Sequence, residues 1–137
     1  MQFKHVTLDF DGSVAILRLD HQEVMNAVSM DMLGGLADAL DAIEEKRAEV
    51  RCLVLTGAGR VFSAGADLDE ARAGLATDPV WEQLSTAIAA LPCLTIAALN
   101  GTLAGGAMGM ALACDLRLAV PGAKVFYPVM KLGFLPQ

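Results

Sequence analysis

Two continuous apolar runs of strand length, each ended by a glycine turn, constrain the fold of this chain most strongly. They cover residues 52–56 and 94–99, and the turns that follow are Gly57-Ala58-Gly59 and Asn100-Gly101. Strands of a parallel sheet are buried on both faces and read as unbroken apolar runs of this kind. A helical pattern follows each turn, so strand, turn and helix recur in one order. The 137 residues therefore predict one α/β domain.

A β-hairpin is predicted ahead of these strands. Val6, Leu8 and Phe10 alternate with polar residues, and the Asp11-Gly12 turn leads into a return strand over residues 14–19.

A helix is predicted to begin after Ser29, which is a good N-cap. Its apolar face is predicted to consist of Leu33, Leu36, Ala37, Leu40 and Ile43. Gly34-Gly35 weakens this helix by about 1 kcal/mol per glycine relative to alanine. Close packing against a neighbouring segment is one explanation for the glycine pair.

The rest of the chain repeats the strand–turn–helix order. Residues 64–74 fit a turn and a short helix, and Thr77-Asp78-Pro79 is a helix start whose helix extends to about residue 91. A helix of small residues is predicted over 105–113, and a third strand over 116–120 before Pro121-Gly122.

Charge and composition exclude several classes of partner. The net charge is −6 with no basic cluster, which argues against nucleic acid. No apolar run reaches the roughly 18 residues needed to cross a bilayer, and no secretory signal pattern opens the chain. Cys52, Cys93 and Cys114 are odd in number and widely spaced, which favours three reduced core thiols in a cytoplasmic protein. The 55% hydrophobic content suits buried strands or buried subunit faces.

Two small-residue turns, residues 62–68 and 103–107, are the candidate functional loops. Each follows a strand and precedes a helix, where backbone N–H groups are unpaired and the backbone can approach a ligand closely. Two such N–H groups aimed at one point would form an oxyanion hole. Taken as local patterns alone, the same turns are more often purely structural.

Other chemistries fail on particular residues. The dinucleotide pattern G-x-G-x-x-G breaks at Phe62, and the nucleophile-elbow pattern around Ser63 breaks at Val61. No His, Cys or acidic cluster has the spacing of a metal site.

Four elements in order carry a family resemblance. They are Met25-Asn26-Ala27, the stretch 54–68, the stretch from Asn100-Gly101 through Ala104-Gly105-Gly106 to residues 111–117, and residues 131–136. On these residues the chain resembles the enoyl-CoA hydratase/isomerase (crotonase) family. The resemblance implies a crotonase-type, ClpP-like spiral of β-β-α units, of which residues 1–137 would be the N-terminal core portion, incomplete at the C-terminus. It further implies homotrimers or dimers of trimers, and a cytoplasmic role in fatty acid metabolism.

The resemblance also implies a site. The backbone N–H groups of Ala66 and Gly106 would bind the thioester carbonyl oxygen of an acyl-CoA, whose coenzyme A is part of the substrate, with no further cofactor and no metal. The substrate and CoA contacts implied are Val24, Asn26, Ala64, Ala66, Asp67, Leu68, Leu103, Gly105, Gly106, Gly109, Val129 and Leu132. Arg60, Arg72 or Lys131 would supply positive charge for the CoA phosphates.

The proton-transfer residues depart from the family pattern. Gly109 and Val129 stand where hydratases of the family place their two glutamates, and neither side chain transfers a proton. Four acids near the first loop, Asp67, Asp69, Glu70 and Asp78, are alternatives, although capping or solvated roles suit them better. Three hypotheses follow: an acyl-CoA lyase or isomerase, a non-catalytic acyl-CoA-binding or scaffold member, and a serine hydrolase acting through Ser63.

Overall fold

A computed structural model of the chain describes residues 1–128, 131 and 133. Its frame is a six-stranded sheet in the order β1-β2-β3-β4-β5-β7. The strands are β1 (Gln2–Phe3), β2 (Val6–Asp11), β3 (Val14–Leu19), β4 (Cys52–Gly57), β5 (Leu94–Leu99) and β7 (Leu116–Ala119). The first three pair antiparallel and the others join in parallel, which confirms both the hairpin and the parallel strands. β1 is too short to show a period in the sequence.

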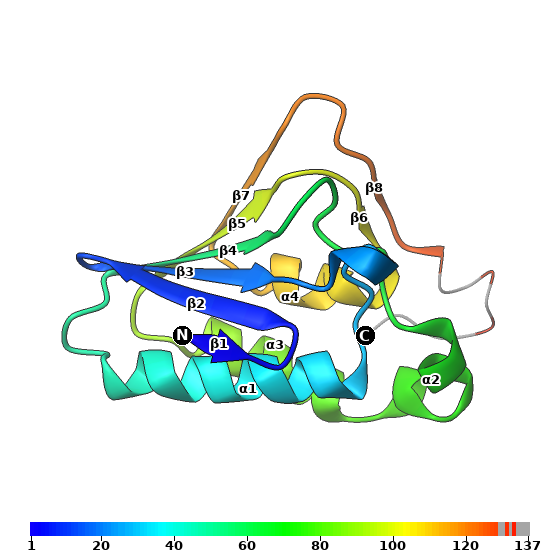
Figure 1. Cartoon of the computed structure of the whole chain (residues 1–137), viewed down its shortest axis with the longest axis horizontal. Coiled ribbons are helices and arrows are strands. Elements are labelled where there is room, and N and C mark those ends of the chain that lie inside the picture. Colours follow the sequence, from blue (N-terminus) through cyan, green and yellow to red (C-terminus); the bar gives the residue numbers. More distant parts are fainter. Residues whose placement is uncertain (129–130, 132, 134–137) are drawn as a thin grey trace.

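A second, smaller sheet pairs β6 (Leu103–Ala104) with β8 (Val125–Phe126) in parallel. Two isolated bridges, Ser63 with Leu103 and Val28 with Ala66, continue the same parallel pairing. Each long parallel strand is therefore followed by a short strand-like segment, in the β-β-α order of the predicted spiral. Figure 1 shows the result as a triangular outline in which strands form the two sloping sides and α1 lies along the base.

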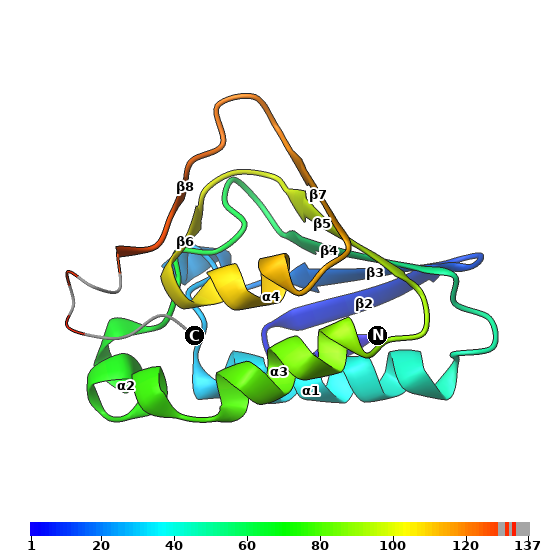
Figure 2. The ribbon, with the colours of Figure 1, turned by 180° about the vertical axis from the view of Figure 1, so that it is seen from behind.

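Four α-helices and three 3₁₀ turns complete the described fold. They are η1 (Gln22–Val24), α1 (Met30–Glu45), α2 (Leu68–Arg72), η2 (Leu75–Thr77), α3 (Val80–Ala89), η3 (Gly105–Ala107) and α4 (Met108–Leu112). The view from behind shows α3 running alongside α1, with α4 inside the outline between α3 and the strands (Figure 2). None of the described helices has the length and apolarity to cross a membrane.

Helix α1 forms as its sequence predicts, with one error. The Ser29 Oγ accepts a hydrogen bond from the Met32 N–H at 3.2 Å, so the predicted cap is present. Ala37 is exposed, because it lies at the solvent edge of a stripe centred on Leu36. The buried face consists of Met32, Leu33, Gly35, Leu36, Ala39, Leu40 and Ile43.

Close packing explains one glycine of the pair in α1. A Cβ at Gly35 would overlap the backbone carbonyl oxygen of Lys4, whereas a Cβ at Gly34 would meet nothing within 4 Å. Close approach of the β1–β2 turn therefore accounts for Gly35 and not for Gly34.

The core lies between the main sheet and the helices. Leu53, Leu55 and Ala97 point into it and are fully buried, but their neighbours along β4 and β5 are half-buried or exposed. All four residues of β7 are exposed. The prediction that these strands are buried on both faces is therefore wrong within the described residues, because helices cover one face of the sheet only.

Candidate functional site

The two candidate loops lie in direct backbone contact. The Ser63 N–H donates to the Thr102 carbonyl at 3.1 Å, and the Ala104 N–H donates to the Ser63 carbonyl at 3.0 Å. Beyond this bridge the loops stay close because both carry glycine. A Cβ on Gly65, whose φ is +99°, would lie 2.9 Å from the Ala104 carbonyl oxygen. A Cβ on Gly105, whose φ is +58°, would lie 3.4 Å from the Gly65 Cα.

Two backbone amides at this contact lack a hydrogen-bond acceptor in the described part of the chain. Among the residues that the structure describes, neither the Ala66 N–H nor the Gly106 N–H donates a hydrogen bond. Their neighbours do: the Asp67 N–H donates to the Val28 carbonyl at 2.8 Å, and the Gly65 N–H donates to the Ser63 Oγ at 3.1 Å. Both free amides are half-buried, and a Cβ on Gly105 would lie 4.0 Å from the Ala66 nitrogen.

Two asparagine side chains fix the turn that leads into the first loop. The Asn26 Nδ2 donates to the carbonyls of Ala58 and Val61 at 3.0 and 3.1 Å. From the other side, the Asn100 Nδ2 donates to the carbonyls of Gly59 and Val61, both at 3.0 Å. The Asn100 Oδ1 also accepts from the Gly57 N–H at 3.1 Å, which ties this turn to the end of β5.

Asn26 and Ser63 are both buried residues that hold backbone segments together. Asn26 is fully buried, its backbone has a φ of +54°, and its Oδ1 accepts from the His21 N–H at 2.8 Å. Its side chain thus positions the first loop, and the direct CoA contact stays a prediction. Ser63 is also fully buried, and its Oγ donates to the Asn26 carbonyl at 2.7 Å. A serine hydrolase needs an accessible hydroxyl beside a base, which this arrangement does not supply.

Trp81 of α3 supports the second loop. Its side chain is buried, and its Nε1–H donates to the Leu75 carbonyl at 2.8 Å. A Cβ added to Gly106 would lie 3.0 Å from the Trp81 Cη2, so the indole packs directly on the glycine backbone. No local pattern in the sequence indicates this contact, because the two residues belong to different elements.

Each acidic residue proposed beside the first loop already has a role or full solvent exposure. Asp67 caps α2 by accepting from the Glu70 N–H at 3.0 Å, and Asp78 accepts from the Val80 N–H at 2.8 Å. The Glu70 Oε1 accepts from the Met30 N–H at 3.0 Å, which joins α2 to the start of α1. Asp69 is 99% exposed and lies 3.8 Å from an Arg72 nitrogen. The predicted capping role of Asp67 is confirmed, whereas Asp78 lies one residue before the N-cap of α3, Pro79, and still accepts from the first amide of that helix.

Gly109 faces α3. A Cβ at this position would lie 3.1 Å from the Ser85 Oγ, and no other atom is within 4 Å. Ser85 is half-buried, and its hydroxyl makes no hydrogen bond to a described residue. Val129 and Leu132, the other predicted contacts at this end of the site, lie outside the described residues.

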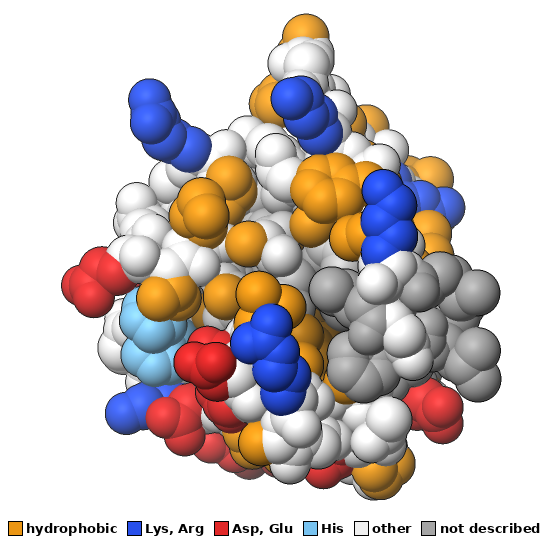
Figure 3. Space-filling model, turned by 90° about the vertical axis from the view of Figure 1, so that its right-hand side faces the viewer, with side chains coloured by type: hydrophobic (Ala, Val, Ile, Leu, Met, Phe, Trp, Pro, Cys, Tyr) orange, Lys and Arg blue, Asp and Glu red, His pale blue; other side chains and the backbone are white. Residues whose placement is uncertain are grey.

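The remaining predicted contacts border the first loop. Val24 and Leu68 are 41% and 53% exposed, and Ala64 is exposed between them in sequence. Leu103 is buried and contributes to the core. Figure 3 shows this side of the molecule, where apolar side chains gather and both basic and acidic side chains lie around them. Arg60 and Arg72 are exposed, as a role toward phosphates would require.

The cysteines are all free thiols. Burial raises the pKa of Cys114 to about 11, and burial also raises the pKa of Cys52 and Cys93, both of which are only half-buried. The prediction of three core cysteines therefore holds for Cys114 alone.

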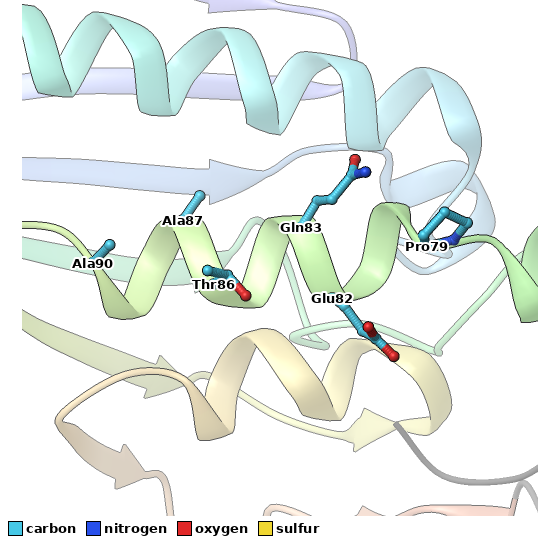
Figure 4. A pocket seen from close by; sticks show the side chains of 6 residues that line it. All are labelled: Pro79, Glu82, Gln83, Thr86, Ala87 and Ala90. Atoms are coloured by element: carbon cyan, nitrogen blue, oxygen red, sulfur yellow. The ribbon is translucent and has the colours of Figure 1, made fainter.

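A shallow hollow of about 580 Å³ lies along the outer side of α3. Figure 4 shows its lining, in which the Glu82 side chain points to the side of α3 where α4 lies and Gln83 points to the opposite side, toward α1. The lining residues are Pro79, Glu82, Gln83, Thr86, Ala87 and Ala90.

The fold is an α/β spiral. Where its two glycine loops meet, the Ala66 and Gly106 N–H groups have no acceptor among the described residues. The enoyl-CoA hydratase/isomerase family model matches residues 9–137. This chain belongs to that family, and its fold is the crotonase fold.

The chain spans about half the length of the relatives that it matches. It is 39% identical to YngF of Bacillus subtilis over 90% of this chain and 49% of that protein. It is 34% identical to the 1,2-epoxyphenylacetyl-CoA isomerase of Escherichia coli, over 93% of this chain and 52% of the isomerase. A crystal structure of an enoyl-CoA hydratase from Bacillus anthracis superposes with a TM-score of 0.87 at 32% identity, over 96% of this chain and 54% of the hydratase.

Proposed function

We propose that the protein acts on acyl-CoA thioesters and stabilises a thioester enolate with the Ala66 and Gly106 amides. The observation that carries this proposal is the pair of free N–H groups at the contact of the two glycine loops. Half-buried donors without a protein acceptor are costly unless a ligand or water satisfies them. A carbonyl oxygen that gains negative charge would satisfy both.

The expected catalytic effect is large, because the donors are fixed before the reaction begins. Chemistry next to a thioester carbonyl, such as addition, isomerisation or decarboxylation, builds negative charge on that oxygen. Loss of one preorganised donor of this kind typically lowers the rate on the order of 10²–10³-fold. The contact through Gly65 and Gly105 and the Trp81 indole against Gly106 supply the rigidity that preorganisation needs.

The CoA moiety is assigned to the border of the first loop. Val24, Ala64 and Leu68 offer exposed apolar surface there. Asp67, Leu103 and Gly105 contribute by holding the loops in place, and Val129 and Leu132 remain proposed contacts from the sequence. Arg60, Arg72 and Lys131 are exposed, and each remains a proposed partner of the CoA phosphates.

The reaction is proposed at the level of lyase or isomerase chemistry. One relative is named as an isomerase and another as a hydratase, so family membership leaves the reaction open. Gly109 offers no side chain for proton transfer, which disfavours hydration by two glutamates. This same observation supports the second candidate, a non-catalytic acyl-CoA-binding or scaffold protein.

Incubation with crotonyl-CoA and a small panel of acyl-CoAs separates these candidates. Turnover detected by mass spectrometry supports the enzyme, whereas thermal stabilisation by the thioesters without turnover supports the binding protein. Neither turnover nor stabilisation by any thioester would refute the proposed function. Free coenzyme A is the control, because it lacks the thioester carbonyl that the two amides are proposed to bind.

We also propose a cytoplasmic protein of fatty acid metabolism that assembles as a homotrimer or a dimer of trimers. The exposed apolar side chains of β7, Leu116 and Leu118, support a buried subunit or segment contact on that side of the sheet. Analytical ultracentrifugation tests the assembly, and a monomer at micromolar concentration would contradict it.

A further inference from the structure

The proton donor or acceptor of the proposed reaction is still unassigned after the first loop has been examined. Asp67, Glu70 and Asp78 accept hydrogen bonds from backbone amides that begin helices, and their carboxylates are held in those caps. Asp69 is fully exposed on α2 beside Arg72. A general acid or base must instead lie within hydrogen-bond reach of the reacting carbon, near the amides that hold the carbonyl.

Helix α3 is the described element that touches the second loop at the required place. Trp81 packs on Gly106, and Ser85, one helical turn later, lies against Gly109. Gly109 is itself one turn after Gly106, so the two helices face each other along Trp81–Gly106 and Ser85–Gly109.

Glu82 lies on the flank of this contact. It follows Trp81 and precedes Ser85 by three residues, a spacing that puts Glu82 and Ser85 on neighbouring parts of one helix surface. Figure 4 shows its carboxylate directed to the α4 side of α3, while the adjacent Gln83 points the other way. A Cβ on Gly109 would lie 3.1 Å from the Ser85 Oγ, so the α3 surface lies directly against the backbone of α4 beside Glu82.

The Glu82 carboxylate is also uncommitted. Across residues 1–128, 131 and 133 it makes no hydrogen bond and no ion pair, unlike the capping acids of the first loop. It is exposed and lines the hollow on α3, so a substrate can reach it from solvent.

We propose that Glu82 is the catalytic acid–base residue of this protein, an inference that rests on the proposed function. The carboxylate takes a proton from the α-carbon of the bound thioester, so the C–H bond breaks and an O–H bond forms on Glu82. The C–H electron pair moves into the enolate, whose charge the Ala66 and Gly106 amides stabilise. The protonated Glu82 then returns a proton to carbon, which restores both groups.

Exchange of the α-proton in D₂O tests this step without knowledge of the physiological reaction. Butyryl-CoA is incubated with wild type, Glu82→Gln, the swap variant Glu82→Gln/Gln83→Glu, and Asp69→Asn as control, and deuterium uptake is followed by mass spectrometry. Thermal stabilisation by butyryl-CoA is measured in parallel for each protein. General acid–base catalysis contributes about 10²–10⁴-fold, so exchange should fall by at least about 100-fold in Glu82→Gln while thioester binding persists.

The swap variant makes the test specific, because it keeps the charge of α3 and moves the carboxylate to the side that faces α1. It should stay as slow as Glu82→Gln, and Asp69→Asn should match wild type. Exchange by Glu82→Gln within threefold of wild type, or loss of exchange in Asp69→Asn instead, would overturn the assignment. Binding without exchange in wild type would overturn the assignment and favour the non-catalytic acyl-CoA-binding protein, whereas absence of binding in wild type would overturn both candidate functions together with it.

Discussion

Replacement of Asn26 by alanine tests how the first loop is held. Its amide connects three backbone groups, the His21 N–H and the carbonyls of Ala58 and Val61. In Asn26→Ala the His21 and Ala58 groups lose their described partner, but the Val61 carbonyl keeps its bond from Asn100.

The size of the effect follows from these bonds and from the backbone. The three hydrogen bonds are part-buried, so each orphaned group costs about 1 kcal/mol, at the low end of the usual range. Alanine at a φ of +54° costs about 1 kcal/mol more than a residue suited to the left-handed region. We expect Asn26→Ala to lose about 3 kcal/mol of unfolding free energy, and Asn26→Gly to lose about 2 kcal/mol because glycine adopts this φ without strain.

Urea unfolding followed by the fluorescence of the single tryptophan, Trp81, measures these differences. The solvent-facing change Asp38→Asn serves as the control and should stay within 0.5 kcal/mol of wild type, as is usual (about ±0.5 kcal/mol) for surface sites. If Asn26→Ala unfolds at the wild-type urea concentration with an unchanged slope, the clamp on the first loop is not what stabilises it.

Three further predictions address packing and thiol burial. Gly34→Ala should stabilise the protein by about 0.5–1 kcal/mol, since a Cβ there meets nothing within 4 Å. Gly35→Ala should destabilise it, since a Cβ there overlaps the β1–β2 turn. Equal shifts of the thermal unfolding temperature in the two variants would contradict this reasoning. Gly106→Ala should cost about 1–3 kcal/mol, and a double-mutant cycle with Trp81→Phe should show coupling rather than additivity in urea unfolding. Cys114 should react with a thiol reagent far more slowly than the other two cysteines at pH 8, and equal rates for all three would refute its burial. Because its folded pKa of about 11 exceeds the usual thiol pKa of 9.0, its contribution to stability is complete below about pH 9 and is lost as the pH rises toward 11.

The sequence predicts the elements whose signal is local. The Asp11-Gly12 hairpin, the Ser29 cap and the Asp67 cap each depend on neighbouring residues, and all are present. β6 and β8 are two residues long, which is too short for a period to be read. The burial of a strand's second face depends on what packs on the sheet. The apolar runs therefore predicted more burial of β4 and β5 than the structure shows.

The site divides in the same way. The glycines of the two loops could be found from local patterns and family resemblance, and the structure brings Gly65 and Gly105 together. The residues that hold those loops could not be found so easily. Trp81 meets Gly106, and Asn100 reaches the Gly57–Val61 turn, through contacts between segments about 25 to 43 residues apart. Such contacts leave no period in a single sequence.

The most direct test of the central claim is the vibrational frequency of a thioester carbonyl bound to the protein. A ¹³C=O-labelled acyl-CoA gives an isotope-edited infrared difference spectrum in which that single carbonyl is visible. If the Ala66 and Gly106 N–H groups both donate to it, the bound carbonyl stretch must lie at lower frequency than in water, because the C=O bond is weakened. A bound thioester whose carbonyl absorbs at or above its frequency in water would contradict an oxyanion hole at these two amides.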